Sequence, residues 1–195
     1  MSNSTSQEQA FRTSLSAVDI NTAGTDAKKL LTKAQSAYGM IPNMFSAMAN
    51  YPALLETYMN GYAQLYASGG FTPVEQEVLF LTISRENGCE YCVAAHSFAG
   101  DFVSNVPKET TDAIRESKEI PDPKLKALNE FALVMMRKKG NPTSADVEKF
   151  KAAGFSENHI LPIILSISIK TLSNFTNHMF HTPLEPMMAS RTWKL

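Results

Sequence analysis

The chain has 195 residues, enough for one domain with a substantial hydrophobic core. Its formal net charge of −1, with 44% hydrophobic and 19% charged residues, argues against nucleic acid or an anionic membrane as the main partner. No stretch reaches the roughly 18 apolar residues of a membrane-spanning helix. The polar N-terminus also lacks the apolar region of a secretory signal. We therefore expect a cytoplasmic protein without a membrane partner, in a compartment that disfavours permanent structural disulfides.

Helical periodicity dominates the first half of the chain. Residues 1–20 form a polar N-terminal segment, and residues 21–195 are predicted to form a single all-helical domain. Apolar residues recur every three or four positions over residues 27–38 and again over residues 52–67, which predicts two amphipathic helices.

The next helix has a strong start signal. Thr72 is a suitable N-cap, Pro73 occupies the first helical position and Glu75 follows the cap by three residues. The helix should run to about Asn87, and Gly88 should end it. A further helix is expected to begin at the first cysteine.

The second half is also predicted to be helical. The pattern over residues 123–139 predicts one helix, and Thr143 with Asp146 predicts the start of another. The isoleucine-rich segment that follows could form a buried strand by propensity. A lone strand would have no partner, so we predict one long buried helix over residues 157–181, with Pro162 tolerated near its first turn.

A shift of 82 residues aligns the two halves of the chain. It places Ser84 on Ser166, Cys92 on Asn174 and His96 on His178. The match is short, so it fits either an accident or a degenerate duplicated helical unit in which the second copy has lost its thiols.

The chemistry is concentrated in the sequence "EQEVLFLTISRENGCEYCVAAH", which holds both cysteines of the chain, Cys89 and Cys92. C-x-x-C spacing in a cytoplasmic protein indicates redox chemistry or metal binding. Cys89 is expected at a helix N-terminus, where unpaired N–H groups favour a thiolate. His96 follows Cys92 by four residues and can take its proton, and Glu77 on the preceding helix can orient His96. These groups are what a thiol peroxidase needs: one thiolate attacks the peroxide, and the second thiol closes a disulfide.

The same residues carry a family resemblance. The spacing of Glu77, Ser84, Cys89, Cys92 and His96 resembles the signature of the AhpD-like, carboxymuconolactone decarboxylase superfamily. The preceding "YGMIPNMFSAMANYPALLETY" resembles its peroxidase-related members, and the likeness runs from about residue 35 to about residue 185. It implies an all-α fold, a homo-oligomer and alkyl hydroperoxide reductase activity.

The resemblance also implies residue roles. Cys92 would attack the peroxide, Cys89 would resolve it, and Glu77 and His96 would match catalytic positions, with no cofactor beyond the Cys89–Cys92 disulfide. Well-known members have a further histidine before the second cysteine, where this chain has Tyr91, so the role of that histidine does not carry over. Helix-terminus electrostatics favour Cys89 as the acidic thiol, so the order of attack stays open, with Cys92 preferred.

Several alternatives remain open. Both cysteines could be small core residues, or they could bind zinc with His96, although a fourth ligand is missing. Ser84 and Tyr91 could line the site or simply pack in the core. The chain could instead be a carboxymuconolactone decarboxylase-like enzyme or a non-catalytic thiol–disulfide redox sensor. For a peroxidase, the expected partners are a hydroperoxide and an electron donor, namely a dithiol, a lipoyl-type group or a peroxiredoxin.

Overall fold

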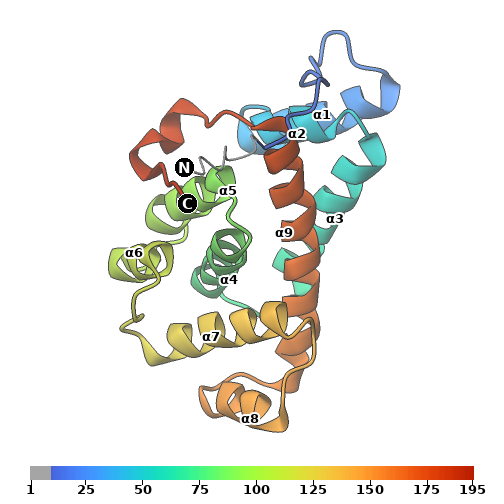
Figure 1. The fold of residues 1–195 in the computed structure, drawn as a ribbon. Coiled ribbons are helices and arrows are strands. Elements are labelled where there is room, and N and C mark those ends of the chain that lie inside the picture. The colour runs from blue at the N-terminus through green and yellow to red at the C-terminus, as the bar shows by residue number, and fades with distance from the viewer. Residues whose placement is uncertain (1–9) are drawn as a thin grey trace, which may run out of the picture.

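The computed structural model describes residues 10–195, and within this range the chain is helical and contains no strand. The expected all-α fold is therefore confirmed (Figure 1). The α-helices are α1 (Thr25–Tyr38), α2 (Asn43–Met48), α3 (Pro52–Ser68), α4 (Pro73–Glu86), α5 (Glu90–Phe102), α6 (Lys108–Glu116), α7 (Pro123–Arg137), α8 (Ser144–Ala152) and α9 (Ile160–Phe180). Two 3-10 helices, η1 (Glu157–His159) and η2 (Pro186–Arg191), complete the described chain.

Helix α4 is the central element, and Figure 1 shows it among α5, α6, α7 and α9. Thr72 caps it as predicted, because the Thr72 Oγ1 accepts from the Glu75 N–H at 3.2 Å and a Glu75 carboxylate oxygen accepts from the Thr72 N–H at 2.8 Å. Every residue from Glu75 to Ser84 is buried, including the polar ones. Because α4 is enclosed on all faces, any of these residues can direct its side chain into the protein interior.

Helix α9 is the long helix predicted for residues 157–181. The 3-10 helix η1 forms its first residues, Pro162 lies in its first turn, and no strand forms. The shift of 82 residues aligns this uninterrupted helix with α4 and α5, which are two helices separated by a turn. The two aligned segments therefore differ in architecture.

Helices α3 and α9 pack closely against each other. A Cβ atom at Gly61 would lie 2.6 Å from Cγ2 of Ile169, so only glycine at this position permits the observed approach. The contact fixes α9 beside α3 and α4, with its buried polar residues turned toward the interior.

Two short helices were not predicted. Helix α2 has six residues, too few to show a period. Helix α6 is polar overall and buries only Thr110, Thr111, Ala113 and Ile114. In both cases the surrounding elements, rather than local sequence pattern, decide the structure.

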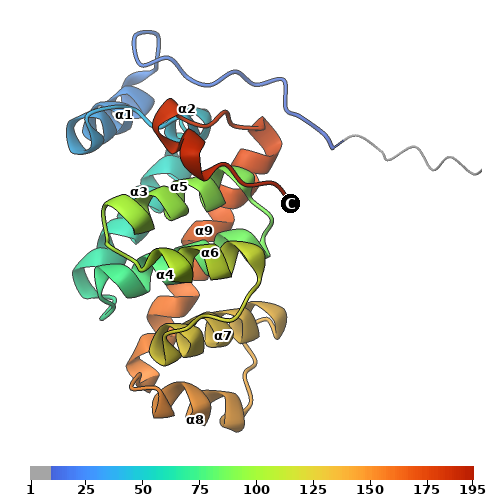
Figure 2. The ribbon, with the colours of Figure 1, turned by 90° about the vertical axis from the view of Figure 1, so that its left-hand side faces the viewer.

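The N-terminal segment lies against the domain from residue 10 onward, and residues 1–9 are outside the described residues. The Thr13 N–H donates to the Met179 carbonyl at 2.9 Å, and the Val18 N–H donates to the Ser46 carbonyl at 2.9 Å. Figure 2 shows this segment running past α1 and α2. It adds contacts to α9 and α2 without adding a regular element.

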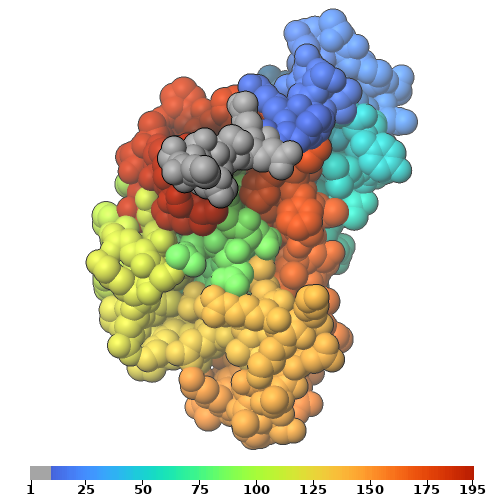
Figure 3. All heavy atoms as spheres, in the orientation of Figure 1, coloured from blue at the N-terminus to red at the C-terminus, as the bar shows by residue number. Residues whose placement is uncertain are grey.

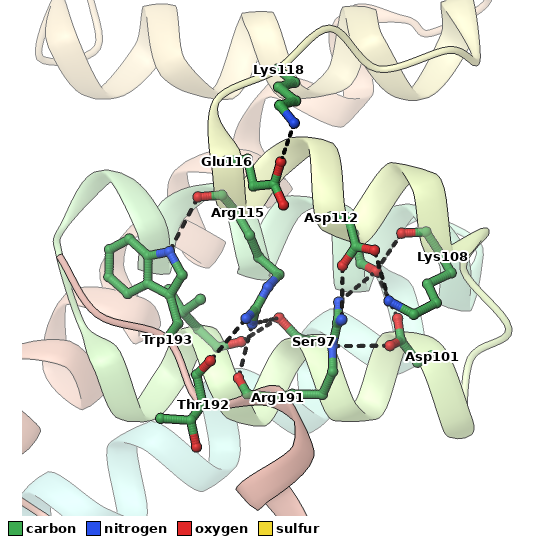
Figure 4. Close-up of polar contacts among 12 residues, drawn as sticks. Ser97, Asp101, Lys108, Asp112, Arg115, Glu116, Lys118, Arg191, Thr192 and Trp193 are labelled. Carbon is green, nitrogen blue, oxygen red and sulfur yellow. Dashed lines mark hydrogen bonds and ion pairs between the residues drawn. The ribbon is translucent and has the colours of Figure 1, made fainter.

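The C-terminal segment, residues 182–195, folds back across α5 and α6 (Figures 3 and 4). Arg191 is buried and forms ion pairs with Asp101 at 3.0 Å and Asp112 at 2.8 Å. Arg115 donates to the carbonyls of Arg191 and Thr192 at 2.9 and 3.0 Å. These contacts hold the segment over the helix that carries the cysteines.

Within residues 10–195, no single helix is long and apolar enough to cross a membrane. Helix α8 and residues 157–180 meet the length and composition requirement only as a pair, and that pair is bent by 106°.

Candidate active site

Both cysteines lie at the turn between α4 and α5. Gly88 adopts φ of +69°, a left-handed conformation that glycine tolerates, and this lets α5 start immediately after α4. Cys89 is the N-cap of α5, and its Sγ accepts from the Cys92 N–H at 3.4 Å. Both thiols are free and buried. The two cysteines are therefore close to each other because Cys89 caps the first turn of α5 and Cys92 lies within that turn.

Helix α9 supplies the polar surroundings of the two sulfurs. Nδ2 of Asn177 lies 3.2 Å from Sγ of Cys92 and 3.9 Å from Sγ of Cys89. Oγ of Ser173 lies 3.9 Å from Sγ of Cys92. An amide N–H directed at a sulfur stabilises its thiolate form.

A continuous chain of polar groups crosses the site. Nδ1 of His96 lies 2.8 Å from Oε2 of Glu77, and Nε2 of His96 lies 2.7 Å from Nζ of Lys170. The Tyr66 hydroxyl donates to Oε1 of Glu77 at 3.3 Å. Burial and the nearby Glu77 carboxylate raise the pKa of Tyr66 to about 12, so it remains a donor. Glu77 is therefore in contact with His96, as the sequence predicts, and a buried lysine completes the chain.

Lys170 changes how His96 can act. With Lys170 as an ammonium, Nζ donates to Nε2 and the remaining ring proton on Nδ1 is donated to Glu77. Both ring nitrogens are then engaged, and the hydrogen bonds of the Cys92 sulfur within residues 10–195 run to Ser173 and Asn177 rather than to His96. The direct contact between His96 and Cys92 expected from the four-residue spacing is therefore not among these hydrogen bonds, and Lys170 acts on the Cys92 sulfur through its charge.

The two thiols have opposite electrostatic environments. Burial opposes charge on Cys92, but a hydrogen bond from Cys89 and the positive charge of Lys170 outweigh it, so the pKa of Cys92 lies well below its ordinary value of 9.0. The same hydrogen bond and burial raise the pKa of Cys89 well above that value. This asymmetry favours Cys92 as the thiolate, although Cys89 is the residue at the helix terminus.

Cys92 opens onto a cavity of about 610 Å³. The Cys92 side has Glu77, His96 and Lys170, while the walls are mainly apolar and aromatic: Tyr38, Met40, Met44, Phe45, Tyr58, Met59, Tyr62, Tyr66, Phe98, Met187 and Met188. A cavity of this size and lining suits an apolar small molecule.

Tyr91 and Ser84, the two possible wall residues, differ in position. Tyr91 lines the cavity, and its hydroxyl donates to Oε1 of Glu185 at 2.8 Å. Burial and the Glu185 carboxylate raise the pKa of Tyr91. Ser84 is buried and is absent from the cavity wall, and its carbonyl accepts from the Cys89 N–H at 3.0 Å. Ser84 thus supports the cysteine turn through its backbone.

Sequence reasoning missed the contribution of α9, namely Lys170, Ser173, Asn174 and Asn177. Their buried polar side chains recur at three- to four-residue spacing in an otherwise apolar helix, and Lys170 is the only acidic or lysine/arginine residue among residues 160–180. That isolated lysine was the available signal, because a buried lysine needs a partner from another element.

The zinc alternative finds no further ligand in the described range. Within residues 10–195, no group of three or more histidine, cysteine, aspartate or glutamate side chains is arranged to hold a metal ion.

Comparisons with known proteins agree with this architecture. Residues 52–99, which include Glu77, both cysteines and His96, match the carboxymuconolactone decarboxylase family. No curated protein sequence matches the chain. An uncharacterized peroxidase-related protein from Ralstonia eutropha JMP134, described as an alkylhydroperoxidase AhpD core, is similar in structure with a TM-score of 0.78 at 22% identity, over 93% of this chain and 95% of that chain.

Two further structures share the fold. An uncharacterized peroxidase-related protein from Silicibacter sp. TM1040 gives a TM-score of 0.76 at 20% identity, over 96% of this chain and 98% of that chain. The debrominase Bmp8 in complex with 2,3,4-tribromopyrrole gives 0.70 at 16% identity, over 94% and 97% of the two chains. The matched segment and the shared fold confirm the resemblance to the AhpD-like, carboxymuconolactone decarboxylase superfamily.

Proposed function

We propose that the protein is a cysteine-based alkyl hydroperoxide reductase, with Cys92 as the attacking thiolate and Cys89 as the resolving thiol. The observation that carries the proposal is the position of Cys92, an acidic thiol at the end of an apolar cavity with a second thiol one helical turn away. The peroxidase-related names of two structural neighbours agree with it.

In the first step, the Cys92 thiolate attacks the terminal oxygen of the hydroperoxide. The O–O bond breaks, the sulfur becomes a sulfenic acid and the alkoxide leaves with a proton as an alcohol. Lys170 lines the same cavity and is positioned to supply that proton, with His96 and Glu77 behind it as a relay. The cavity's apolar walls favour an organic hydroperoxide over hydrogen peroxide.

In the second step, Cys89 attacks the sulfenic sulfur and water leaves, which forms the Cys89–Cys92 disulfide. The disulfide takes the place of a separate cofactor. A dithiol or lipoyl-type donor, or a peroxiredoxin partner in the same chain of transfers, must return two electrons before the next turnover.

The test is to add an alkyl hydroperoxide to fully reduced protein and to monitor the loss of the two thiols by intact-protein mass spectrometry. Wild type should lose two hydrogens rapidly, Cys89→Ser should accumulate the sulfenic acid, and Cys92→Ser should be inert.

A mirror-image result in the two variants would keep the enzyme class and exchange the roles of the cysteines. A rate no faster than that of an ordinary free thiol would overturn the proposal. In that case, disulfide formation with diamide alone would favour a redox sensor, and turnover of a carboxylated lactone by the double Cys→Ser variant would favour the decarboxylase-like enzyme.

A second candidate is reductive dehalogenation, which the apolar cavity and the likeness to a debrominase favour. The balanced reaction converts a bromoarene and two thiols into the arene, a disulfide and hydrogen bromide. Release of bromide from a bromopyrrole by the reduced protein, at a rate above that of peroxide reduction, would select this activity.

A further inference from the structure

The two cysteines line different cavities, and both are buried, with Cys89 0% and Cys92 2% exposed. Cys92 lines the apolar cavity described above, whereas Cys89 lines a second cavity of about 580 Å³ between the start of α5, the end of α9 and the C-terminal segment. Lining residues of the second cavity include Cys89, Asn177, His178, Thr182, Trp193 and Leu195. Tyr91 is the one residue common to the two linings, and its hydrogen bond to Glu185 fixes it as the partition.

We propose that the two substrates use separate entrances: the hydroperoxide reaches Cys92 through the first cavity, and a small dithiol reaches Cys89 through the second. The peroxide half of this inference rests on the proposed function. The inference that the dithiol enters through the second cavity requires only that Cys89 and Cys92 form a disulfide.

The chemistry of disulfide reduction selects the sulfur that is attacked. A donor thiolate forms a bond to one sulfur of the disulfide, and the other sulfur leaves with the electron pair of the broken S–S bond. The thiol with the lower pKa leaves faster. The environment of Cys92 lowers its pKa and that of Cys89 raises it, so Cys92 is the better leaving group and Cys89 is the sulfur attacked.

The rest of the reduction balances without another reactant. Attack on Cys89 gives a mixed disulfide with the donor and releases the Cys92 thiolate. The second thiol of the donor, once deprotonated, attacks its own sulfur in the mixed disulfide. Cys89 leaves and takes up a proton, and the donor departs as a disulfide.

Displacement at sulfur runs in line, with the nucleophile opposite the leaving group. Cys92 lines the first cavity, Cys89 lines the second, and the two residues are adjacent across one helical turn. The hydroxyl lost from the sulfenic acid would therefore leave into the first cavity, and the dithiol would approach from the second. Neither cysteine lines the cavity of the other, so a donor in the first cavity would face the wrong sulfur.

The second cavity has the composition expected for a polar donor. The ring nitrogens of His178 and His181 and the Thr182 hydroxyl offer hydrogen-bonding groups, and this lining lacks the methionines that line the first cavity. The side chain of Leu195 lies against Gly88, next to Cys89. The C-terminal residue thus forms one wall of this entrance.

The experiment measures the two half-reactions separately. The disulfide is formed with diamide and its reduction by dithiothreitol is followed, and the oxidation of reduced protein by cumene hydroperoxide is followed independently. His178→Trp fills the second cavity from an exposed position on α9, and Ala63→Trp fills the first from an exposed position on α3. His178→Ala is the control for loss of the imidazole.

His178→Trp should slow reduction by about tenfold and leave oxidation nearly unchanged, whereas Ala63→Trp should slow oxidation by about tenfold. Deletion of Leu195 opens the second entrance and should speed reduction. The inference would be overturned if Ala63→Trp, and not His178→Trp, slowed the reduction of the disulfide by dithiothreitol. It would also be overturned if none of the changes affected the rate of that reduction. If the reduced wild type does not react with cumene hydroperoxide, the proposed function fails, while the diamide and dithiothreitol measurements still decide the entrance of the donor.

Discussion

At the scale of single residues, the charge of Lys170 decides which thiol is reactive. Its side chain is buried, contacts His96 and lies over the face of Phe80 at 5.8 Å from the ring centroid. Its positive charge lowers the pKa of Cys92 against the opposing effect of burial. A lysine in this position acts on the sulfur through the field, without a direct hydrogen bond from its ammonium.

Lys170→Met should therefore raise the pKa of Cys92 and slow its alkylation by iodoacetamide at neutral pH, by about tenfold for each unit of increase. The rise in rate with pH should move to higher pH in this variant. Lys170→Arg keeps the charge and should stay closer to wild type, and His96→Ala should show a smaller shift in the same direction. A thiolate absorbance titration that is the same for Lys170→Met and wild type would contradict the role assigned to the lysine.

The lowered pKa of Cys92 also links stability to pH. Folding lowers this pKa, so the folded state binds fewer protons than the unfolded state between the two pKa values. The resulting stabilisation is fully present above the ordinary thiol pKa of 9.0, which applies to the unfolded chain. It is lost as the pH falls through the folded pKa, and Cys92→Ser lacks this contribution altogether.

At the scale of elements, the C-terminal segment completes the site that α4, α5 and α9 form. It brings Glu185, Met187 and Met188 to the first cavity and Thr192–Leu195 to the second. Figure 4 shows how Arg191 and Arg115 bind it to α5 and α6. The ion pair of Arg191 with Asp101 is almost fully enclosed, so its loss leaves a buried carboxylate with the Thr111 hydroxyl as a hydrogen-bond donor but without its charged partner.

Arg191→Met is expected to lower the free energy of unfolding by about 3 kcal/mol, measured by urea denaturation. The double variant with Asp101→Asn should lose less than the sum of the two single changes, because the unpaired charge is removed as well. Lys118→Met, which breaks an exposed ion pair with Glu116 on α6, is the control and should leave stability essentially unchanged. An equally small effect of Arg191→Met would show that the segment is not held by this pair.

At the scale of the whole molecule, α9 presents apolar side chains on its outer side as well as polar ones on its inner side. Leu161, Ile164, Phe175 and Met179 are exposed and lie near one stripe of this helix. Figure 3 shows α9, in orange, at the molecular surface. We propose that this stripe forms the contact of the homo-oligomer that the family resemblance implies.

Replacing Ile164 and Phe175 with lysine should reduce the molar mass in solution to that of a single chain, as measured by light scattering. Lys149→Glu, an exposed charge reversal on α8, is the matched control and should leave the mass unchanged. A wild-type mass of one chain would contradict the proposal outright, and an unaltered assembly in the double variant would move the interface elsewhere.

The sequence by itself determined the longer helices and the closeness of the reactive groups that neighbour one another in the chain. Apolar periodicity over residues 52–67 and 123–139, the capping box at Thr72 and the break at Gly88 act within a few residues of the chain, so local pattern was enough to predict the helices there. Cys89 and Cys92 are neighbours because one helical turn separates them. The contact between Glu77 and His96 follows from two helices joined by a short turn.

Only the tertiary structure decided what surrounds those groups. Lys170, Ser173 and Asn177 lie about eighty residues from Cys92 in sequence. Because α9 packs across α3 and α4, Ser173 and Asn177 reach the Cys92 sulfur and Lys170 reaches His96. The energy of a buried charge depends on the groups that enclose it, and no local pattern specifies those groups. The choice of Cys92 as the acidic thiol, and the partition of the two cysteines between two cavities by Tyr91, therefore come from the folded arrangement.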